Sequence, residues 1–259
     1  MDQERLEAIK VELSLGEVQY LHSTGSTNDD AHKWLMNDAP HLSVIVANEQ
    51  TQGRGRLDHR WFTPPDSALA LSIILVDEIQ SINLLRYSGL GSLAVYDAIF
   101  HQTDDKVQIK WPNDLLISGR KVGGVLPEAY WLGSNIKGIV LGIGLNISER
   151  SLPTEDLLSY PATYLEFHTQ QEVNQAEMCK AILKGVIKWS NRLGTADFIK
   201  AWDSRLAYKG KPVQINLSNQ ETREGTLVGI ANDGEILITF TDGSVGKYNS
   251  NELSLFPGA

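Results

Sequence analysis

Residues 107–126, VQIKWPNDLLISGRKVGGVL, decide the fold class. Apolar segments lie on both sides of Lys110–Asn113, and Ser118–Arg120 has the composition of a tight hairpin turn into the apolar segment 122–126. Strands joined by such turns are antiparallel, whereas a doubly wound sheet needs helical crossovers between parallel strands. This stretch therefore predicts an α+β fold with a mixed β-sheet flanked by helices.

Hydrophobic periodicity extends this prediction in both directions. Apolar residues three and four positions apart predict a short N-terminal helix, and further helical patterns follow at 29–35, 84–100 and, as one or two helices, 176–205. Apolar runs predict strands at 17–21, 42–47, 68–76, 107–109, 114–117, 122–126 and 136–145. The region 51–66, with its glycines, prolines and arginines, is predicted to be a loop.

The pattern changes after Ala207. Short alternating segments follow one another, separated by the hairpin signals Asn232-Asp233-Gly234 and Asp242-Gly243. Their number and length are typical of a small SH3-like β-barrel. We therefore predict two domains, a catalytic domain over residues 1–207 and a C-terminal SH3-like domain over 208–259.

Composition limits the classes of function. The 23 Lys and Arg residues against 32 Asp and Glu give a net charge of −9, which argues against nucleic acid as a partner. Cys179 is the single cysteine, so an intrachain disulfide is excluded, and we expect it to be a small buried side chain. Neither a signal peptide nor an apolar run of membrane-spanning length is present, and we expect a soluble cytoplasmic protein.

The first candidate for chemistry is Gly53-Arg54-Gly55-Arg56, with Trp61 shortly after it. Glycines let a ligand approach the backbone, and guanidinium groups suit phosphate or carboxylate. The alternative is an ordinary solvated arginine loop.

Two further clusters follow. Lys110, held before Trp111-Pro112, is placed to neutralise an anion at a strand end, although it could be an ordinary surface lysine. The glycines of 119–124 and 142–146 could leave room for a flat ring or a phosphate, or could simply allow close packing.

Taken together, these clusters resemble the ordered signature of biotin protein ligases, from about Leu21 to the C-terminus. The matching elements are Ser26-Thr27-Asn28, Gln50 with Gly53–Arg56, Lys110–Asp114, Gly119–Gly124 and Gly144–Asn146. The glycine–arginine and KWPND elements, in this order and about fifty residues apart, are the specific part.

The resemblance implies a role for each matching residue. Biotin would be bound by Ser26, Thr27, Asn28, Gln50, Gly53, Arg54, Gly55, Arg56 and Lys110. The nucleotide would be bound by Trp61, which would stack on adenine, together with Lys121 and Asn146. Lys110 and Arg56 would act in catalysis by meeting the biotin carboxylate and the α-phosphate. None of these residues is expected to be a metal ligand.

The reaction that the resemblance implies has two steps. ATP and biotin, with Mg²⁺, would form biotinyl-5′-AMP, and a lysine of a biotin carboxyl carrier protein, from acetyl-CoA carboxylase or a related carboxylase, would then accept biotin. No nucleophile on the enzyme is needed, because the work is positioning and charge stabilisation. The resemblance leaves both a monomer and a homodimer open.

Two positions depart from the family pattern, and two rival functions remain. Pro127 predicts that its strand lies at an edge or ends early, and His59 stands where relatives often have a basic residue. A lipoate or other acyl-cofactor ligase would share the fold. A biotin-responsive repressor would carry a winged helix before the polar stretch that starts at Ser23, whereas only about 22 residues precede that stretch here.

Overall fold

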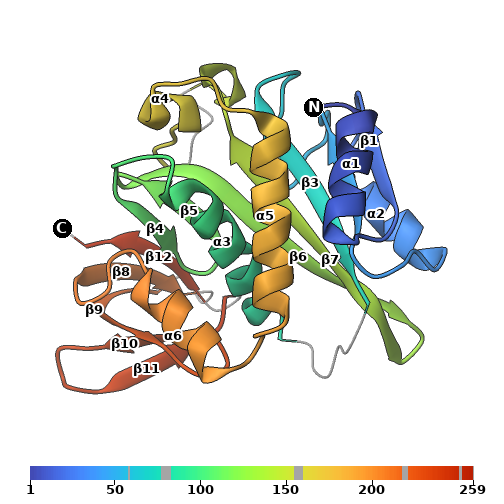
Figure 1. Ribbon diagram of the computed structural model, residues 1–259. Coiled ribbons are helices and arrows are strands. Elements are labelled where there is room, and N and C mark those ends of the chain that lie inside the picture. Colours follow the sequence, from blue (N-terminus) through green and yellow to red (C-terminus); the bar gives the residue numbers. More distant parts are fainter. Residues whose placement is uncertain (58, 77–82, 155–159, 218–220, 251–252, 259) are drawn as a thin grey trace.

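The computed structural model describes residues 1–57, 59–76, 83–154, 160–217, 221–250 and 253–258 (Figure 1). Its helices are α1 (Gln3–Leu13), α2 (Thr27–Met36), α3 (Leu84–Phe100), α4 (Leu165–Thr169), α5 (Gln175–Ser190), α6 (Ala196–Ser204) and the 3₁₀ helix η1 (Glu149–Ser151). The first sheet contains β1 (Val18–Leu21), β2 (Ser43–Ala47), β3 (Ala68–Leu75), β4 (Val107–Lys110), β5 (Asp114–Ile117), β6 (Arg120–Leu132) and β7 (Asn135–Asn146). The second contains β8 (Pro212–Leu217), β9 (Thr222–Ile230), β10 (Ile236–Thr239), β11 (Val245–Tyr248) and β12 (Leu253–Pro257).

The first sheet is mixed, as predicted. Its seven strands follow the order β1-β2-β3-β7-β6-β5-β4. Only the β1–β2 pair is parallel, and the hairpin turns at Gly119 and Gly133, both with positive φ, join antiparallel neighbours. Glycine is suited to such turns because it has no Cβ to clash. The α+β prediction is confirmed, and the ends of most elements lie within a few residues of those expected.

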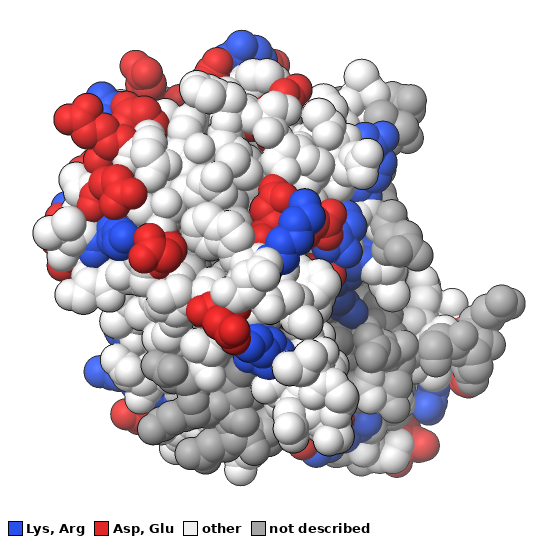
Figure 2. Space-filling model, turned by 90° about the vertical axis from the view of Figure 1, so that its right-hand side faces the viewer, with Lys and Arg blue, Asp and Glu red and all other residues white. Residues whose placement is uncertain are grey.

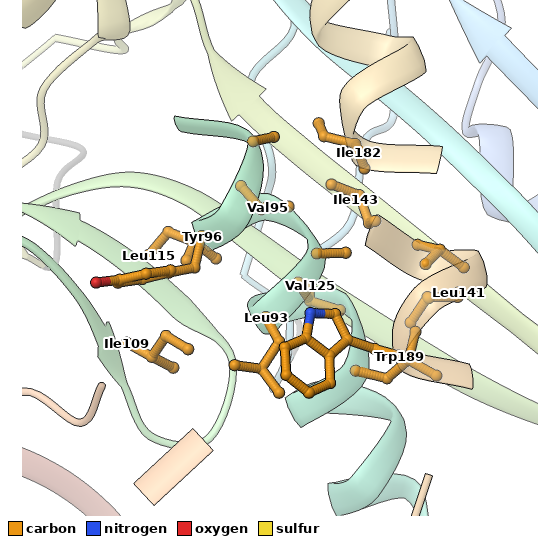
Figure 3. Close-up of a cluster of buried hydrophobic side chains, with 14 of the residues drawn as sticks. Leu93, Val95, Tyr96, Ile109, Leu115, Val125, Leu141, Ile143, Ile182 and Trp189 are labelled. Atoms are coloured by element: carbon orange, nitrogen blue, oxygen red, sulfur yellow. The ribbon is translucent and has the colours of Figure 1, made fainter. Parts of the chain in front are cut away.

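Helices cover both faces of this sheet. On one face α3 packs between the sheet and α5, and Leu93, Val125 and Leu141 belong to the buried cluster shown in Figure 3. On the other face α2 packs through Ala31 and Leu35. Because strand residues alternate between faces, the sheet is apolar on both sides along its central strands.

Helix α3 contains two glycines that lie directly against neighbouring side chains. Gly89 lies against the indole of Trp202, and Gly91 lies against Val125, so a Cβ at either position would overlap its neighbour. The glycines therefore allow close packing.

Cys179 in α5 is fully buried, as expected, and burial raises the pKa of its thiol to about 12. Among the described residues no helix has the length and apolar character to span a membrane.

Strand β6 shows how the Pro127 departure is accommodated. The predicted end of the strand near Leu126 is wrong, because β6 continues to Leu132. The prediction of an edge is confirmed: β5 pairs with β6 only as far as Gly124, whereas β7 pairs with it from Gly123 to Leu132. Proline lacks an N–H, and on this side of β6 no neighbouring strand in the described part of the chain needs one.

The small C-terminal β-unit has the predicted strand number. Its strands form one antiparallel sheet in the order β11-β10-β9-β8-β12, and among the described residues the predicted SH3-like barrel is not closed, because β11 and β12 lie at opposite ends of the order. The unit packs on the first sheet through the buried Trp111, whose indole N–H donates to the carbonyl of Gly234 at 2.9 Å. The proposed domain boundary after Ala207 falls between α6 and β8 and stays a prediction.

Candidate functional site

A cavity of about 640 Å³ lies where α2, the loop 50–62, β5–β7 and the C-terminal unit meet. It is lined by all but one of the residues that the sequence singled out: Ser26, Thr27, Asn28, Gln50, Arg54, Gly55, Arg56, Trp61, Lys110, Lys121 and Asn146. Gly53 is the exception, and it lines a second cavity of about 570 Å³, which shares Arg54, Gly55 and Arg56 with the first. Segments far apart in sequence thus converge on one site.

Three glycines on neighbouring strands clear the floor of this cavity. Gly124 and Gly144 are register partners on β6 and β7, and Gly142 lies two residues before Gly144 on the same face. A Cβ on Gly142 would overlap the amide of Asn28, and a Cβ on Gly144 would overlap the indole of Trp61. The space predicted for a flat ring or phosphate is therefore partly used by the protein's own side chains, which rest directly on the backbone.

One end of the cavity is polar. Gln50 accepts from the backbone N–H of Thr27 at 2.8 Å and from its hydroxyl at 3.1 Å, and donates to Thr63 at 3.2 Å. Ser72 lies 2.7 Å from the Thr27 hydroxyl and 2.6 Å from the amide oxygen of Asn28. Ser26 begins α2 as its N-cap residue but makes no side-chain cap hydrogen bond. These short polar groups are held in place by one another.

Ser72 was missed by sequence reasoning. It is fully buried in β3, the apolar strand ALALSIIL, where it is the only polar residue. A buried hydroxyl needs hydrogen-bond partners. A lone serine in an otherwise apolar strand was therefore the signal that could have placed it beside the polar residues of α2.

The opposite end is cationic and centred on Asp114. Lys121 lies 2.5 Å and Lys110 3.7 Å from its carboxylate. Burial alone would raise the pKa of Asp114, but the charges of Lys121 and Lys110 outweigh burial and lower it. Burial, followed by repulsion from Lys121 and Arg56, lowers the pKa of Lys110 despite the attraction of Asp114. Three cations share one carboxylate, so an excess of positive charge is left for an anionic ligand.

Aromatic rings form the wall beside Lys110. Its ammonium nitrogen lies 4.8 Å from the ring centre of Tyr160 and 5.6 Å from that of Phe256. Burial, with the neighbouring Tyr208, raises the pKa of Tyr160, which therefore stays a neutral ring. Sequence reasoning found neither ring, because Phe256 comes from the C-terminal unit and no motif marks Tyr160.

The two arginines of the loop point to different partners. Arg56 donates to the backbone carbonyl of Ser250 at 2.6 Å and to Asn113 at 3.4 Å, and burial lowers its pKa. Arg54 instead pairs with Asp29 at 2.6 Å and with Glu128 at 3.0 Å. Both line the cavity, but only Arg56 adds its charge to the cationic end.

Trp61 and Asn146 lie at the predicted nucleotide end. The Trp61 indole lies directly against Gly144 of β7, with the Lys121 ammonium 5.8 Å from its ring centre. Asn146 is buried and donates to the carbonyl of Thr163 at 3.0 Å. Their contact with a nucleotide stays a prediction. His59 also lines the cavity.

Comparison with known proteins places this geometry in a family. A sequence profile of the biotin/lipoate A/B protein ligase family matches residues 19–146, the stretch that supplies most of the cavity lining. Residues 19–146 of this chain are a domain of this family. The matched stretch contains the polar end, the glycine–arginine loop and the cationic end.

Family relatives match over most of the chain. The bifunctional ligase/repressor BirA of Bacillus spizizenii is 29% identical over 95% of this chain and 76% of its own length. The biotin–[acetyl-CoA-carboxylase] ligase of Paracoccus denitrificans is 29% identical over 84% of this chain and 92% of its own. The structure of the Aquifex aeolicus biotin protein ligase in complex with biotin and ATP matches with a TM-score of 0.79 and 27% identity, covering 93% of this chain and 99% of that one.

Proposed function

We propose that this protein is an ATP-dependent biotin protein ligase that forms biotinyl-5′-AMP and transfers biotin to a lysine of a biotin carboxyl carrier protein. One observation carries the proposal: a single cavity joins the polar end around Thr27 to a cationic end in which Lys110, Lys121 and Arg56 face one carboxylate. The ureido ring of biotin needs hydrogen-bonding groups, and its carboxylate and the phosphates of ATP need cations. The biotin and ATP bound by the Aquifex relative support this assignment.

The first step brings two anions together. A carboxylate oxygen of biotin attacks the α-phosphorus of ATP, the bond to the β-phosphate oxygen breaks, and pyrophosphate leaves. Lys110 lies between Asp114 and the aromatic wall, where it can offset the negative charge that gathers as these anions approach. Lys121 and Arg56 add their positive charges to this field. Burial strengthens these charge interactions by removing water.

In the second step the neutral ε-amine of the carrier lysine attacks the acyl carbonyl of biotinyl-5′-AMP. An amide forms, AMP leaves, and the amine proton is lost to solvent or to the departing phosphate. The enzyme supplies no nucleophile for this step. Its contribution is to hold the mixed anhydride in place and away from water until the amine arrives.

We expect Mg²⁺ as a cofactor, but the described residues that line this cavity offer it no carboxylate that is free of an ion pair. Among the described lining residues Asp114 is the single carboxylate, and Lys121 and Lys110 already pair with it. The donor set therefore does not fit a protein-bound metal. Mg²⁺ commonly enters active sites on substrate phosphates, and we derive no step through it.

The test is direct. Purified protein is incubated with ATP, Mg²⁺, biotin and a biotin carboxyl carrier domain, and the carrier is weighed by mass spectrometry. We expect the mass of one biotinyl group on the carrier, and no such gain when ATP is omitted. Pyrophosphate–ATP exchange with biotin and with lipoate in parallel separates this function from that of a lipoate ligase. Exchange with lipoate alone would contradict the proposal.

A further inference from the structure

Glu128 lies at a junction between the sheet and the glycine–arginine loop. It stands on β6 just after Pro127, beyond the point where β5 stops covering this strand. Arg54 donates to both of its oxygens, at 3.0 and 3.1 Å, and Asn28 donates at 2.6 Å. The hydroxyl of Tyr130 donates at 3.3 Å. One carboxylate thus accepts from three side chains on three different segments.

The guanidinium charge of Arg54 is already neutralised by ion pairs within the protein. A second carboxylate, Asp29, lies 2.6 Å from the same guanidinium. Burial would lower the pKa of Arg54, but Glu128 and then Asp29 outweigh burial and raise it. Two carboxylates face one guanidinium, so this cluster carries a net negative charge. Such a cluster is unsuited to neutralising a phosphate, and it is well suited to fixing the loop that carries Arg54.

The same carboxylate also orients a residue of the polar end. Asn28 is buried, its amide oxygen lies 2.6 Å from Ser72, and its amide nitrogen donates to Glu128 and to the carbonyl of Leu126. Glu128 therefore selects which way the amide faces. Glu128 therefore contacts both Asn28, at the start of α2, and Arg54, in the glycine–arginine loop, and so links these two segments by hydrogen bonds.

We propose that Glu128 is a positioning residue that tethers the glycine–arginine loop, described at residues 51–57 and 59–61, over the polar end of the cavity and at the same time fixes the amide of Asn28. Asp29 supports the tether through Arg54 alone. The proposal deepens the proposed function, on which its substrate readout rests. It assigns the side chain of Arg54 to holding the loop and leaves anion binding to Arg56, Lys110 and Lys121.

The test uses chymotrypsin on the unliganded protein, because Leu57, Trp61 and Phe62 are cleavage sites within or next to the loop. Glu128→Gln keeps the shape of the side chain but removes its charge. We expect the loop to be cut about tenfold faster than in the wild type, since a charge-assisted pair of this kind is lost. Asp29→Asn is the matched variant and should accelerate cleavage less, because the two bonds from Arg54 to Glu128 remain.

A double-mutant cycle identifies the partner. Arg54→Met should accelerate cleavage as Glu128→Gln does, and the double variant should be cut no faster than either single one. Additive effects of the two substitutions would overturn the proposal, as would cleavage of Glu128→Gln at the wild-type rate with an unchanged Tm. If Glu128→Gln fails to fold, the cleavage rates of Arg54→Met and Asp29→Asn are compared instead, and the tether requires Arg54→Met to be cut faster.

A kinetic readout separates the tether from the proposed function. Glu128→Gln should raise KM for biotin by about tenfold with a smaller change in kcat, because Asn28 loses its charged partner. Asp29→Asn should leave this KM close to the wild-type value. Faster cleavage of Glu128→Gln in a protein that does not use biotin would support the tether and contradict the ligase assignment. A fall in kcat with KM unchanged would remove Glu128 from substrate positioning.

Discussion

Lys121 lies 2.5 Å from Asp114, and this ion pair is the centre of the cationic end of the cavity. The two residues belong to neighbouring strands, β6 and β5, so the sheet itself fixes their approach. Lys110 is held more loosely, 3.7 Å from the same carboxylate. The two lysines therefore differ in role: Lys121 neutralises the Asp114 carboxylate, and the positive charge of Lys110, farther from that carboxylate, is more available to an anionic ligand.

Replacement of Lys110 by alanine should damage adenylation far more than folding. Its charge meets two anions whose repulsion is greatest in the transition state, so we expect a loss of about 2–4 kcal/mol, or roughly two to three orders of magnitude in rate. Asp114 keeps Lys121 as its partner, so the Tm should change little. Pyrophosphate–ATP exchange measures the effect, with Lys211→Ala, an exposed lysine outside the cavity, as control. Exchange within a few-fold of the wild type would remove Lys110 from the mechanism.

Asp114 should make the fold sensitive to acid. Burial would raise its pKa, but Lys121 and Lys110 lower it below the ordinary value. A carboxyl with a lowered folded-state pKa stabilises the protein above its unfolded pKa, about 3.9, and this stability is lost as the pH falls through the folded-state pKa. Asp114→Asn should therefore lower the free energy of unfolding at neutral pH. Below about pH 4 the variant should lose less of its free energy of unfolding than the wild type does.

Urea denaturation at neutral and acidic pH measures this difference. The control is Asp104→Asn, which removes an exposed carboxyl outside the cavity. Because Asp114→Asn leaves Lys121, Lys110 and Arg56 without a counter-charge, added ATP should restore more stability to it than to the control. Equal denaturation curves for the two variants at both pH values would contradict the role assigned to Asp114.

Local pattern was enough to predict most of the helices and strands of this fold, and the family resemblance named many of the residues that line the cavity. Apolar periodicity located α3 to the residue, and the motif residues predicted to form one site, except Gly53, do line one cavity. Contacts made across long sequence separations were not predictable. Arg54 meets Glu128 across 74 residues and Arg56 meets Ser250 across 194, and no local rule indicates either pair.

The length of β6 was also not predictable from local sequence, because it depends on how the strands pair. A proline inside an apolar run favours the end of a strand, so the prediction stopped near Leu126. The strand continues because β5 has already ended and leaves Pro127 at an edge. Only the pairing of the strands, which depends on the whole sheet, shows that the missing N–H costs nothing there.

We expect no sequence-specific DNA binding at physiological salt, although relatives such as the Bacillus spizizenii protein are named ligase/repressors. The net charge is −9, and Figure 2 shows acidic and basic side chains interspersed among uncharged ones on the face it presents. Affinity for DNA depends on a cluster of cations that meet phosphates. Titration of labelled duplexes, with and without biotin and ATP, checks this expectation. A sub-micromolar shift that depends on sequence would overturn it.

Arg56→Gly should leave part of the adenylation activity but loosen the hold on the intermediate. The arginine joins the loop to the C-terminal unit through the carbonyl of Ser250, at 2.6 Å, and glycine removes that bond and adds backbone freedom. A loop that no longer closes would let biotinyl-5′-AMP escape, because enclosure protects a reactive intermediate. We therefore expect free biotinyl-5′-AMP in solution and biotin on bystander proteins, with reduced selectivity for the carrier.

The measurement is a chase of the loaded enzyme with a bystander protein, followed by streptavidin blotting. Leu57→Gly is the matched control: it adds freedom at the next position, where φ is already 52°, and keeps the Arg56–Ser250 bond. Leakage from Arg56→Gly well above that from Leu57→Gly would show that the contact with the C-terminal unit retains the intermediate. Complete loss of adenylation without leakage would instead place Arg56 in the first chemical step, beside Lys110, where its buried charge would offset the incoming phosphate.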